Sequence, residues 1–116
     1  MLCNNNMAII TFYLCDNFNW DNYKTKVYKD IINVDNPVEV IWDLRGMTNI
    51  PSFSTLMKQF NLMKKEKESI KKNIIKNSVI VSSQMNRDLL LWCFKYFYSP
   101  QNPTLVFTVD EWDSLR

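Results

Sequence analysis

The chain has 116 residues, of which 47% are hydrophobic, 14% aromatic and 22% charged, and its formal net charge is +2. This length corresponds to one domain, residues 1–116, and the composition excludes an intrinsically disordered chain. The sequence contains no histidine, which argues against the commonest general base and the commonest metal ligand.

The first third of the chain predicts a strand followed by a helix. Residues 7–15 (MAIITFYLC) are rich in β-branched and aromatic side chains, which favour a strand. Apolar side chains then recur at helical spacing from Trp20 to Ile31, with lysines and aspartates between them. Asn17 or Asn19 is expected to cap this helix, and a DNP sequence follows it as a chain break.

The second strand and the second helix meet at the only glycine of the chain. In residues 38–44 (VEVIWDL), every second side chain is apolar, and Glu39, Ile41 and Asp43 stand between these apolar positions. This alternation predicts a strand. Gly46 is expected to supply the positive φ of a strand-to-helix turn, because glycine adopts that conformation without strain. A helix is expected to begin near Ser52. Its apolar stripe consists of Phe53, Leu56, Met57, Phe60 and Met63.

The rest of the chain continues the alternation of strands and helices. Residues 64–77, rich in lysine, are expected to form a long irregular connection before a strand at residues 78–83. Asn86 is expected to cap the next helix (RDLLLWCFKYFY), which is apolar almost all round and should be largely buried. A last strand at residues 104–109 leads into a short helix capped by Asp110.

This order of elements predicts an α/β fold. Strands that alternate with helices imply parallel pairing and right-handed crossovers. Parallel sheets that are covered on both faces read as continuous apolar runs, whereas the second strand places Glu39 and Asp43 on one face. Helices are therefore expected mainly on one face. The other face, with Ile9, Tyr13 and Ile41, is left partly open and could bind another molecule.

The junction at Gly46 carries a family pattern. Asp43, Leu44 and Gly46 close a strand, and Ile50 and Ser52 stand at the start of the following helix. This pattern resembles the STAS domains, which include anti-sigma-factor antagonists of bacteria and cytoplasmic domains of sulfate transporters. In that family Asp-Leu-Ser-Gly ends a strand and Ile-Asp-Ser-Ser-Gly-Leu-Gly opens a helix. The resemblance, together with a similar order of elements, implies a STAS-type fold. This is a four-turn βα superhelix, whose mostly parallel, four-stranded sheet runs in sequential order with helices mainly on one face, and lipid-binding CRAL-TRIO domains share it.

The resemblance also implies a regulatory role for one serine. In STAS domains the first serine of the pair is phosphorylated by a partner kinase, which releases the bound anti-sigma factor, and Ser52 holds that position. A phosphate there would be stabilised by the N-terminus of the helix. The chain departs from the family at the neighbouring positions, where Pro51 replaces an acidic residue and Phe53 replaces the second serine. The alternative for Ser52 is an ordinary N-cap.

We therefore expect a non-enzymatic, regulatory protein-binding module without a cofactor or a metal. It would bind a partner protein, or a second copy of itself, through the helix start or through the open sheet face. The expected contact residues are Arg45, Met47, Ser52, Phe53, Ser54 and Thr55. Most aromatic residues of the third helix are expected in the core, although Tyr96 and Tyr98 could reach the surface and join a partner contact.

Two alternative functions stay open. By analogy with CRAL-TRIO domains, the chain could bind lipid or another small apolar ligand. The segment Lys58–Lys76 could instead bind an anionic surface or nucleic acid. Its contact residues would be Lys64, Lys65, Lys67, Lys71 and Lys72. Two glutamates interrupt these lysines and no aromatic residue lies between residues 61 and 77, so base stacking is not expected and nucleic acid is disfavoured.

The sequence also carries expectations about location. No apolar run approaches the roughly 18 residues that a membrane span needs, and the N-terminus lacks the basic region of a signal peptide. We expect a soluble, cytoplasmic protein without a transmembrane segment. Cys3, Cys15 and Cys93 have no metal-ligand spacing and are expected to be reduced thiols.

Overall fold

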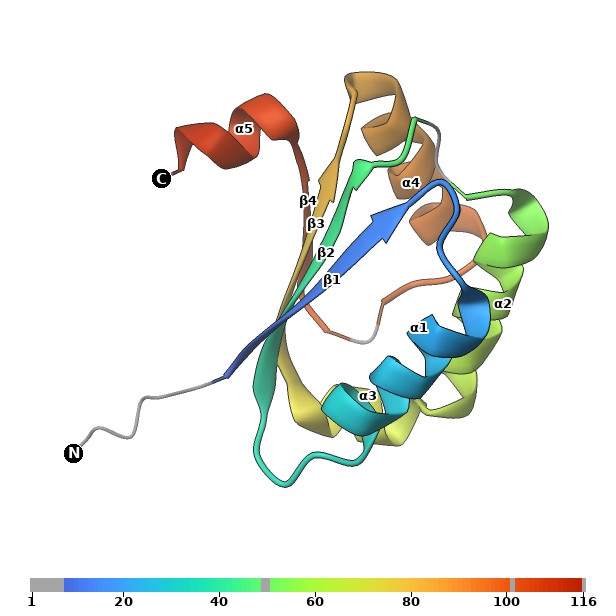
Figure 1. The fold of residues 1–116 in the computed structure, drawn as a ribbon, viewed down its shortest axis with the longest axis vertical. Coiled ribbons are helices and arrows are strands. Elements are labelled where there is room, and N and C mark those ends of the chain that lie inside the picture. The colour runs from blue at the N-terminus through green and yellow to red at the C-terminus, as the bar shows by residue number, and fades with distance from the viewer. Residues whose placement is uncertain (1–7, 49–50, 101, 116) are drawn as a thin grey trace.

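Four parallel strands form the centre of the molecule. The computed structural model describes residues 8–48, 51–100 and 102–115. The elements run in the order β1 (Ile9–Cys15), α1 (Trp20–Val27), a π-helical turn η1 (Tyr28–Ile32), β2 (Val38–Gly46), α2 (Phe53–Lys65), α3 (Lys67–Asn73), β3 (Ile74–Val81), α4 (Gln84–Tyr96), β4 (Thr104–Thr108) and α5 (Val109–Ser114). The strands pair in chain order, β1-β2-β3-β4, and every pair is parallel (Figure 1). The predicted α/β fold and sequential sheet are confirmed.

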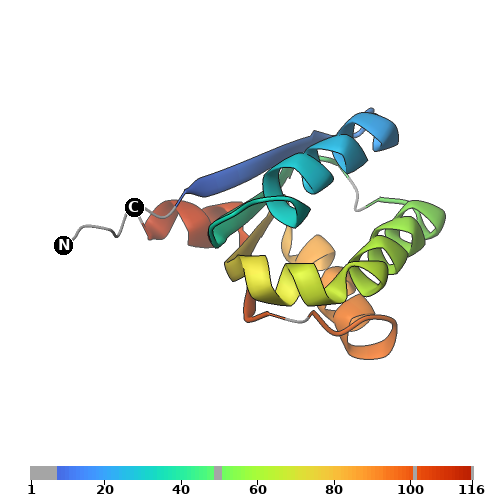
Figure 2. The ribbon, with the colours of Figure 1, turned by 90° about the horizontal axis from the view of Figure 1, so that it is seen from below.

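Helices α1 to α4 cover one face of the sheet, whereas α5 lies on the other (Figures 1 and 2). On the covered face, Phe12, Trp42, Val79 and Val106 form one row across the four strands. Phe12, Val79 and Val106 are buried there against the helices. Burial of this apolar surface is the main stabilising term, and the expectation of helices mainly on one face is confirmed.

The opposite face is open at one end and covered at the other. Ile9 and Tyr13 are exposed there, as expected, and Ile41 is half-buried. Ile80 points to the same face, because it pairs with Asp43 of β2, and it is only 1% exposed. Helix α5 lies over this end of the face. The face is therefore less open than its alternating sequence suggests.

The lysine-rich stretch expected to be irregular is ordered, and that expectation is wrong. Residues 67–73 form α3, and β3 begins at Ile74, four residues before the predicted strand. Ile70 and Ile74, each 2% exposed, anchor the stretch in the core. Asn73 is also buried, and its side-chain amide donates to the carbonyls of Ile31 and Ile32 at the end of η1. The buried side chains, not the exposed lysines, determine the structure here.

Two of the helix caps are the residues expected from the sequence, and two are different residues. Asn19 caps α1 and Ser52 caps α2, as expected. Ser83, not Asn86, caps α4, because the Asn86 side chain instead donates to the carbonyl of Thr48 and the hydroxyl of Ser82. Thr108, not Asp110, caps α5.

Gly46 does not have the positive φ that the sequence suggested, so that expectation is wrong. It is the last residue of β2 and pairs with Cys15 where the register of β1 shifts. A Cβ atom on Gly46 would lie 3.2 Å from the carbonyl oxygen of Leu14 and 3.3 Å from the Cβ atom of Cys15. The glycine therefore permits a close approach of two strands rather than a left-handed turn. Ile50, which carries part of the family pattern, lies outside the described residues.

Candidate protein-binding surface on helix α4

Helix α4 exposes large apolar side chains to solvent. Met85, Leu89, Trp92 and Tyr96 have exposed fractions of 68%, 44%, 51% and 60%. They follow each other at intervals of four, three and four residues, so they lie along one side of the helix. The expectation that this helix is largely buried is wrong, since only Asn86, Leu90 and Cys93 are buried along it.

Two apolar stripes share this helix. Leu90, Cys93 and Phe94 pack toward the sheet and α2, and the stripe from Met85 to Tyr96 lies about a third of a turn away, given 3.6 residues per turn. Apolar periodicity alone predicts a buried helix when both stripes are present. Met85, Leu89, Trp92 and Tyr96 repeat at helical spacing on their own, apart from the buried stripe. This second repeat was the signal that could have distinguished the two stripes, and we did not identify it from the sequence.

The exposed stripe continues onto the start of α2 through aromatic contacts. The rings of Trp92 and Tyr96 are 5.3 Å apart, and those of Trp92 and Phe97 are 5.2 Å apart. The ring of Phe53, which is 58% exposed, lies 5.3 Å from that of Phe97. We call the exposed residues of this region the α4 surface. Its members are Phe53, Met85, Leu89, Trp92 and Tyr96.

The residues expected to bind a partner at the start of α2 lie together. Ser52, Phe53 and Ser54 are exposed and Thr55 is half-buried. The Ser52 hydroxyl accepts a hydrogen bond from the Thr55 backbone amide at 3.3 Å and donates to the Thr55 hydroxyl at 3.1 Å. Ser52 therefore acts as the N-cap, and its hydroxyl is exposed. Phosphorylation of Ser52 stays a prediction.

The other two expected contact residues lie elsewhere. Met47 is only 3% exposed and packs with Leu44 and Leu90, so its side chain belongs to the core and the expectation of a contact there is wrong. Arg45 points to the face that α5 covers, opposite α2, where it joins Asp43. These two residues do not form one surface with Ser52 and Ser54.

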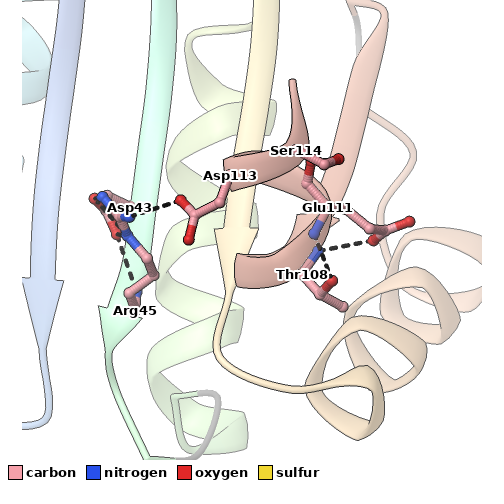
Figure 3. A network of polar contacts seen from close by, with 6 residues as sticks. All are labelled: Asp43, Arg45, Thr108, Glu111, Asp113 and Ser114. Carbon is pink, nitrogen blue, oxygen red and sulfur yellow. Dashed lines mark hydrogen bonds and ion pairs between the residues drawn. The ribbon is translucent and has the colours of Figure 1, made fainter. Parts of the chain in front are cut away.

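Arg45 stands at the centre of a polar network on the α5 side, shown in Figure 3. Its guanidinium bonds both carboxylate oxygens of Asp43, at 3.0 Å from Nε and 2.6 Å from Nη2, and its backbone amide donates as well. Burial alone would raise the pKa of Asp43, but the hydrogen bonds and the charge of Arg45 outweigh it and hold this pKa below its usual value. The buried carboxylate is thus fully paired and takes a structural role.

The same network ties α5 to the sheet. Nη1 of Arg45 lies 4.0 Å from a carboxylate oxygen of Asp113. Thr108 and Glu111 form a capping box, in which each side chain bonds the backbone of the other (Figure 3). Arg87 of α4 reaches past β4, donates to the Val106 carbonyl and lies 3.6 Å from Glu111. Helix α5 is therefore fixed at both of its ends.

The lysines of the segment Lys58–Lys76 lie on α2, on α3 and at the start of β3. Lys58, Lys64, Lys65, Lys67, Lys71, Lys72 and Lys76 are all exposed. Glu68 stands among them and is exposed too, and Glu66 accepts a hydrogen bond from the Tyr28 hydroxyl at 2.8 Å. The structure places these lysines on the outside of two consecutive helices and at the start of the strand that follows them. Binding of an anionic partner there stays a prediction.

An apolar cavity of about 120 Å³ opens between the sheet and the helices. Trp42, Phe60 and Phe94 line it, and Tyr23 contributes a phenol whose pKa is raised far above its usual value by burial, despite a 2.6 Å hydrogen bond to Gln59. Asn102 also lines it. The Asn102 side-chain oxygen is buried without a hydrogen-bond partner, alone among the side-chain atoms of the described residues.

Groups for metal or covalent chemistry do not gather in the described part of the chain. Within residues 8–48, 51–100 and 102–115, no three Cys, Asp or Glu side chains lie close enough together to hold a metal ion. Of the described cysteines, Cys15 is exposed, whereas Cys93 is buried and burial raises the pKa of its thiol. None of the helices described here has both the length and the apolar character needed to cross a membrane.

Comparison of the chain with protein-family models, with curated proteins and with solved structures gives no match.

Proposed function

We propose that this chain is a non-enzymatic protein-binding module of STAS type, and that it binds its partner through the α4 surface. The observation that carries the proposal is the row of apolar side chains on α4 that stays exposed among the described residues. Contiguous apolar patches of this kind on a folded domain mark interaction sites. Aromatic residues and methionine are also the types enriched where proteins meet.

The energetics favour this surface over the others. Full burial of one large apolar side chain contributes roughly 1.5–3 kcal/mol, and the α4 surface offers five such side chains within reach of one partner. Trp92 and Tyr96 have few rotatable bonds, so their burial costs little conformational entropy, and such residues are typical binding hot spots. Phe53 belongs to the surface and Ser54 follows it in the chain, so the helix start that the family pattern singles out lies at the rim of the surface.

Capture of proteins from an extract of the native host tests this proposal. Immobilised wild-type protein is compared with Trp92→Glu and with Leu105→Glu, in which an equally exposed side chain on the opposite face of the sheet is changed. We expect Trp92→Glu to lose its bound protein and Leu105→Glu to keep it. Retention by Trp92→Glu at the wild-type level would contradict the proposal.

The cavity favours a second candidate function, the binding of a small apolar ligand. Ligand sites commonly enclose about 300–1,000 Å³, so a cavity of about 120 Å³ has room for one aromatic ring but not for a lipid chain. The unpaired oxygen of Asn102 would accept a hydrogen bond from a ring that carries a donor. We expect phenol to raise the melting temperature more than benzene does, and Val79→Phe, which fills the cavity, to remove the effect. No shift with either compound would contradict this candidate.

A further inference from the structure

We infer that the α4 surface, the site of the proposed function, is covered by a second copy of this chain, with the two α4 helices packed antiparallel about a two-fold axis. The inference rests on that proposed function and names its partner. The intervals of four, three and four residues between Met85, Leu89, Trp92 and Tyr96 are those of one seam of a two-helix coiled coil. A seam of this kind fits another helix of the same period.

An antiparallel pair makes the four layers of the seam complementary. With the axis passing midway along the stripe, Met85 lies opposite Tyr96 of the partner copy, and Leu89 lies opposite its Trp92. Each layer then joins one aromatic to one aliphatic side chain, so large and smaller groups interdigitate. A parallel pair would instead place each side chain against its own copy and set Trp92 against Trp92.

The charges beside the stripe also match an antiparallel pair. Asp88 and Lys95 are exposed, and each stands one residue before a member of the stripe, Leu89 and Tyr96 respectively. Such flanking positions face each other in an antiparallel pair, which brings Asp88 of each copy to Lys95 of the other. Two attractive pairs therefore form at once.

A parallel pair would form no ion pairs with Asp88 and Lys95, because of the residues on the opposite flank of the stripe. In a parallel pair Asp88 would face the partner residue five positions later, which is Cys93, and Lys95 would face Pro100, which lies beyond the end of α4. Cys93 is buried in the fold of its own chain, and Pro100 is half-buried and carries no charge. The flank with Asp88 and Lys95 is the free one, so the antiparallel arrangement is the one that uses it.

Charge reversal tests the inference, with sedimentation equilibrium of the full chain from about 5 to 500 µM as the measurement. We expect the wild-type protein to shift from monomer to dimer as concentration rises. Asp88→Lys alone and Lys95→Asp alone each place like charges opposite one another, so each should weaken dimerisation about tenfold. The double variant, Asp88→Lys with Lys95→Asp, should restore it, because the two pairs are then merely reversed.

A mixture gives the sharpest form of the test. The Asp88→Lys and Lys95→Asp chains, each weakly associating alone, should form a mixed dimer, because two positive positions then face two negative ones. Circular dichroism confirms that each variant is folded. A wild-type protein that stays monomeric up to about 500 µM, or single reversals that leave dimerisation unchanged, would overturn the inference. A monomer that still captures another protein in a Trp92-dependent way would overturn the inference and leave the proposed function standing.

Discussion

The two sides of this molecule differ in whether another element of the fold covers their apolar side chains. On the α5 side, Trp112 of α5 packs on Phe107 of β4 with their rings 5.4 Å apart, and Arg45 joins the sheet to the same helix. On the α4 side, none of the residues that the structure describes covers Trp92 and its neighbours in this way. Helix α5 covers one end of the first side, on which Ile9 and Tyr13 of β1 and Leu105 of β4 stay exposed on separate strands, whereas the exposed apolar side chains of the second side form one row along a single helix.

Two phenylalanines on α2 offer the strongest test of whether the exposed aromatic rings of the α4 surface lie outside the core. Phe60 is 3% exposed and its ring stacks on that of Tyr98 at 5.2 Å, whereas Phe53 is 58% exposed. We expect Phe60→Ala to lower the free energy of unfolding by about 3–5 kcal/mol, because it leaves a hole in the core. Phe53→Ala should lower it by less than about 1 kcal/mol, because solvent already reaches that ring. Urea denaturation of both variants measures the two values, and equal losses would show that Phe53 is a core residue.

Removal of one charge tests the polar network on the α5 side. Asp43→Asn keeps an acceptor for Arg45 but loses the ion pair, and we expect the free energy of unfolding to fall by about 1–2 kcal/mol at pH 7. The pKa of Asp43 is lowered in the folded protein, so its contribution is complete above about pH 4 and is lost as pH falls through the folded-state pKa. The difference between wild type and variant should therefore shrink below about pH 4. A difference that is constant from pH 7 to pH 2 would mean that the charge of Asp43 contributes nothing.

The fold was more predictable than the site, for a physical reason. The alternation of strand and helix patterns is local, and it was enough to give parallel strands and the main helical layer, whereas the sequential strand order followed from the resemblance to STAS domains. The ordered structure of residues 67–77 was missed because exposed lysines concealed two buried anchors, Ile70 and Ile74. Of the α4 surface, Phe53 and Tyr96 were expected as possible contacts, but Met85, Leu89 and Trp92 were missed, because periodicity does not say which of two apolar stripes faces the sheet. The contact between Arg45 and Asp113 joins residues far apart in the chain, which no local pattern reports.

Loosening α5 should expose the side of the sheet that it now covers. Thr108→Ala removes the N-cap hydroxyl that accepts a hydrogen bond from the backbone at 3.3 Å. We expect the free energy of unfolding to fall by about 1 kcal/mol, as is usual for loss of a cap. Hydrogen exchange of the α5 amides should accelerate, while exchange in α4 stays at the wild-type rate. Faster exchange in both helices would mean that the two sides of the sheet are coupled.

The two described cysteines give the mildest test, because it changes no residue of either surface. Cys93 lies on the buried side of α4, one residue after Trp92, and burial raises the pKa of its thiol. Thiolate is the reactive form, so we expect Cys93 to react with a thiol reagent at pH 8 at least tenfold more slowly than the exposed Cys15. The experiment uses a Cys3→Ser variant, so that only Cys15 and Cys93 can react with the reagent. Mass spectrometry then identifies which peptide is modified. If Cys93 reacted as fast as Cys15, α4 would have to detach from the sheet readily, and a helix that detaches could not present Met85, Leu89, Trp92 and Tyr96 as one fixed row to a partner.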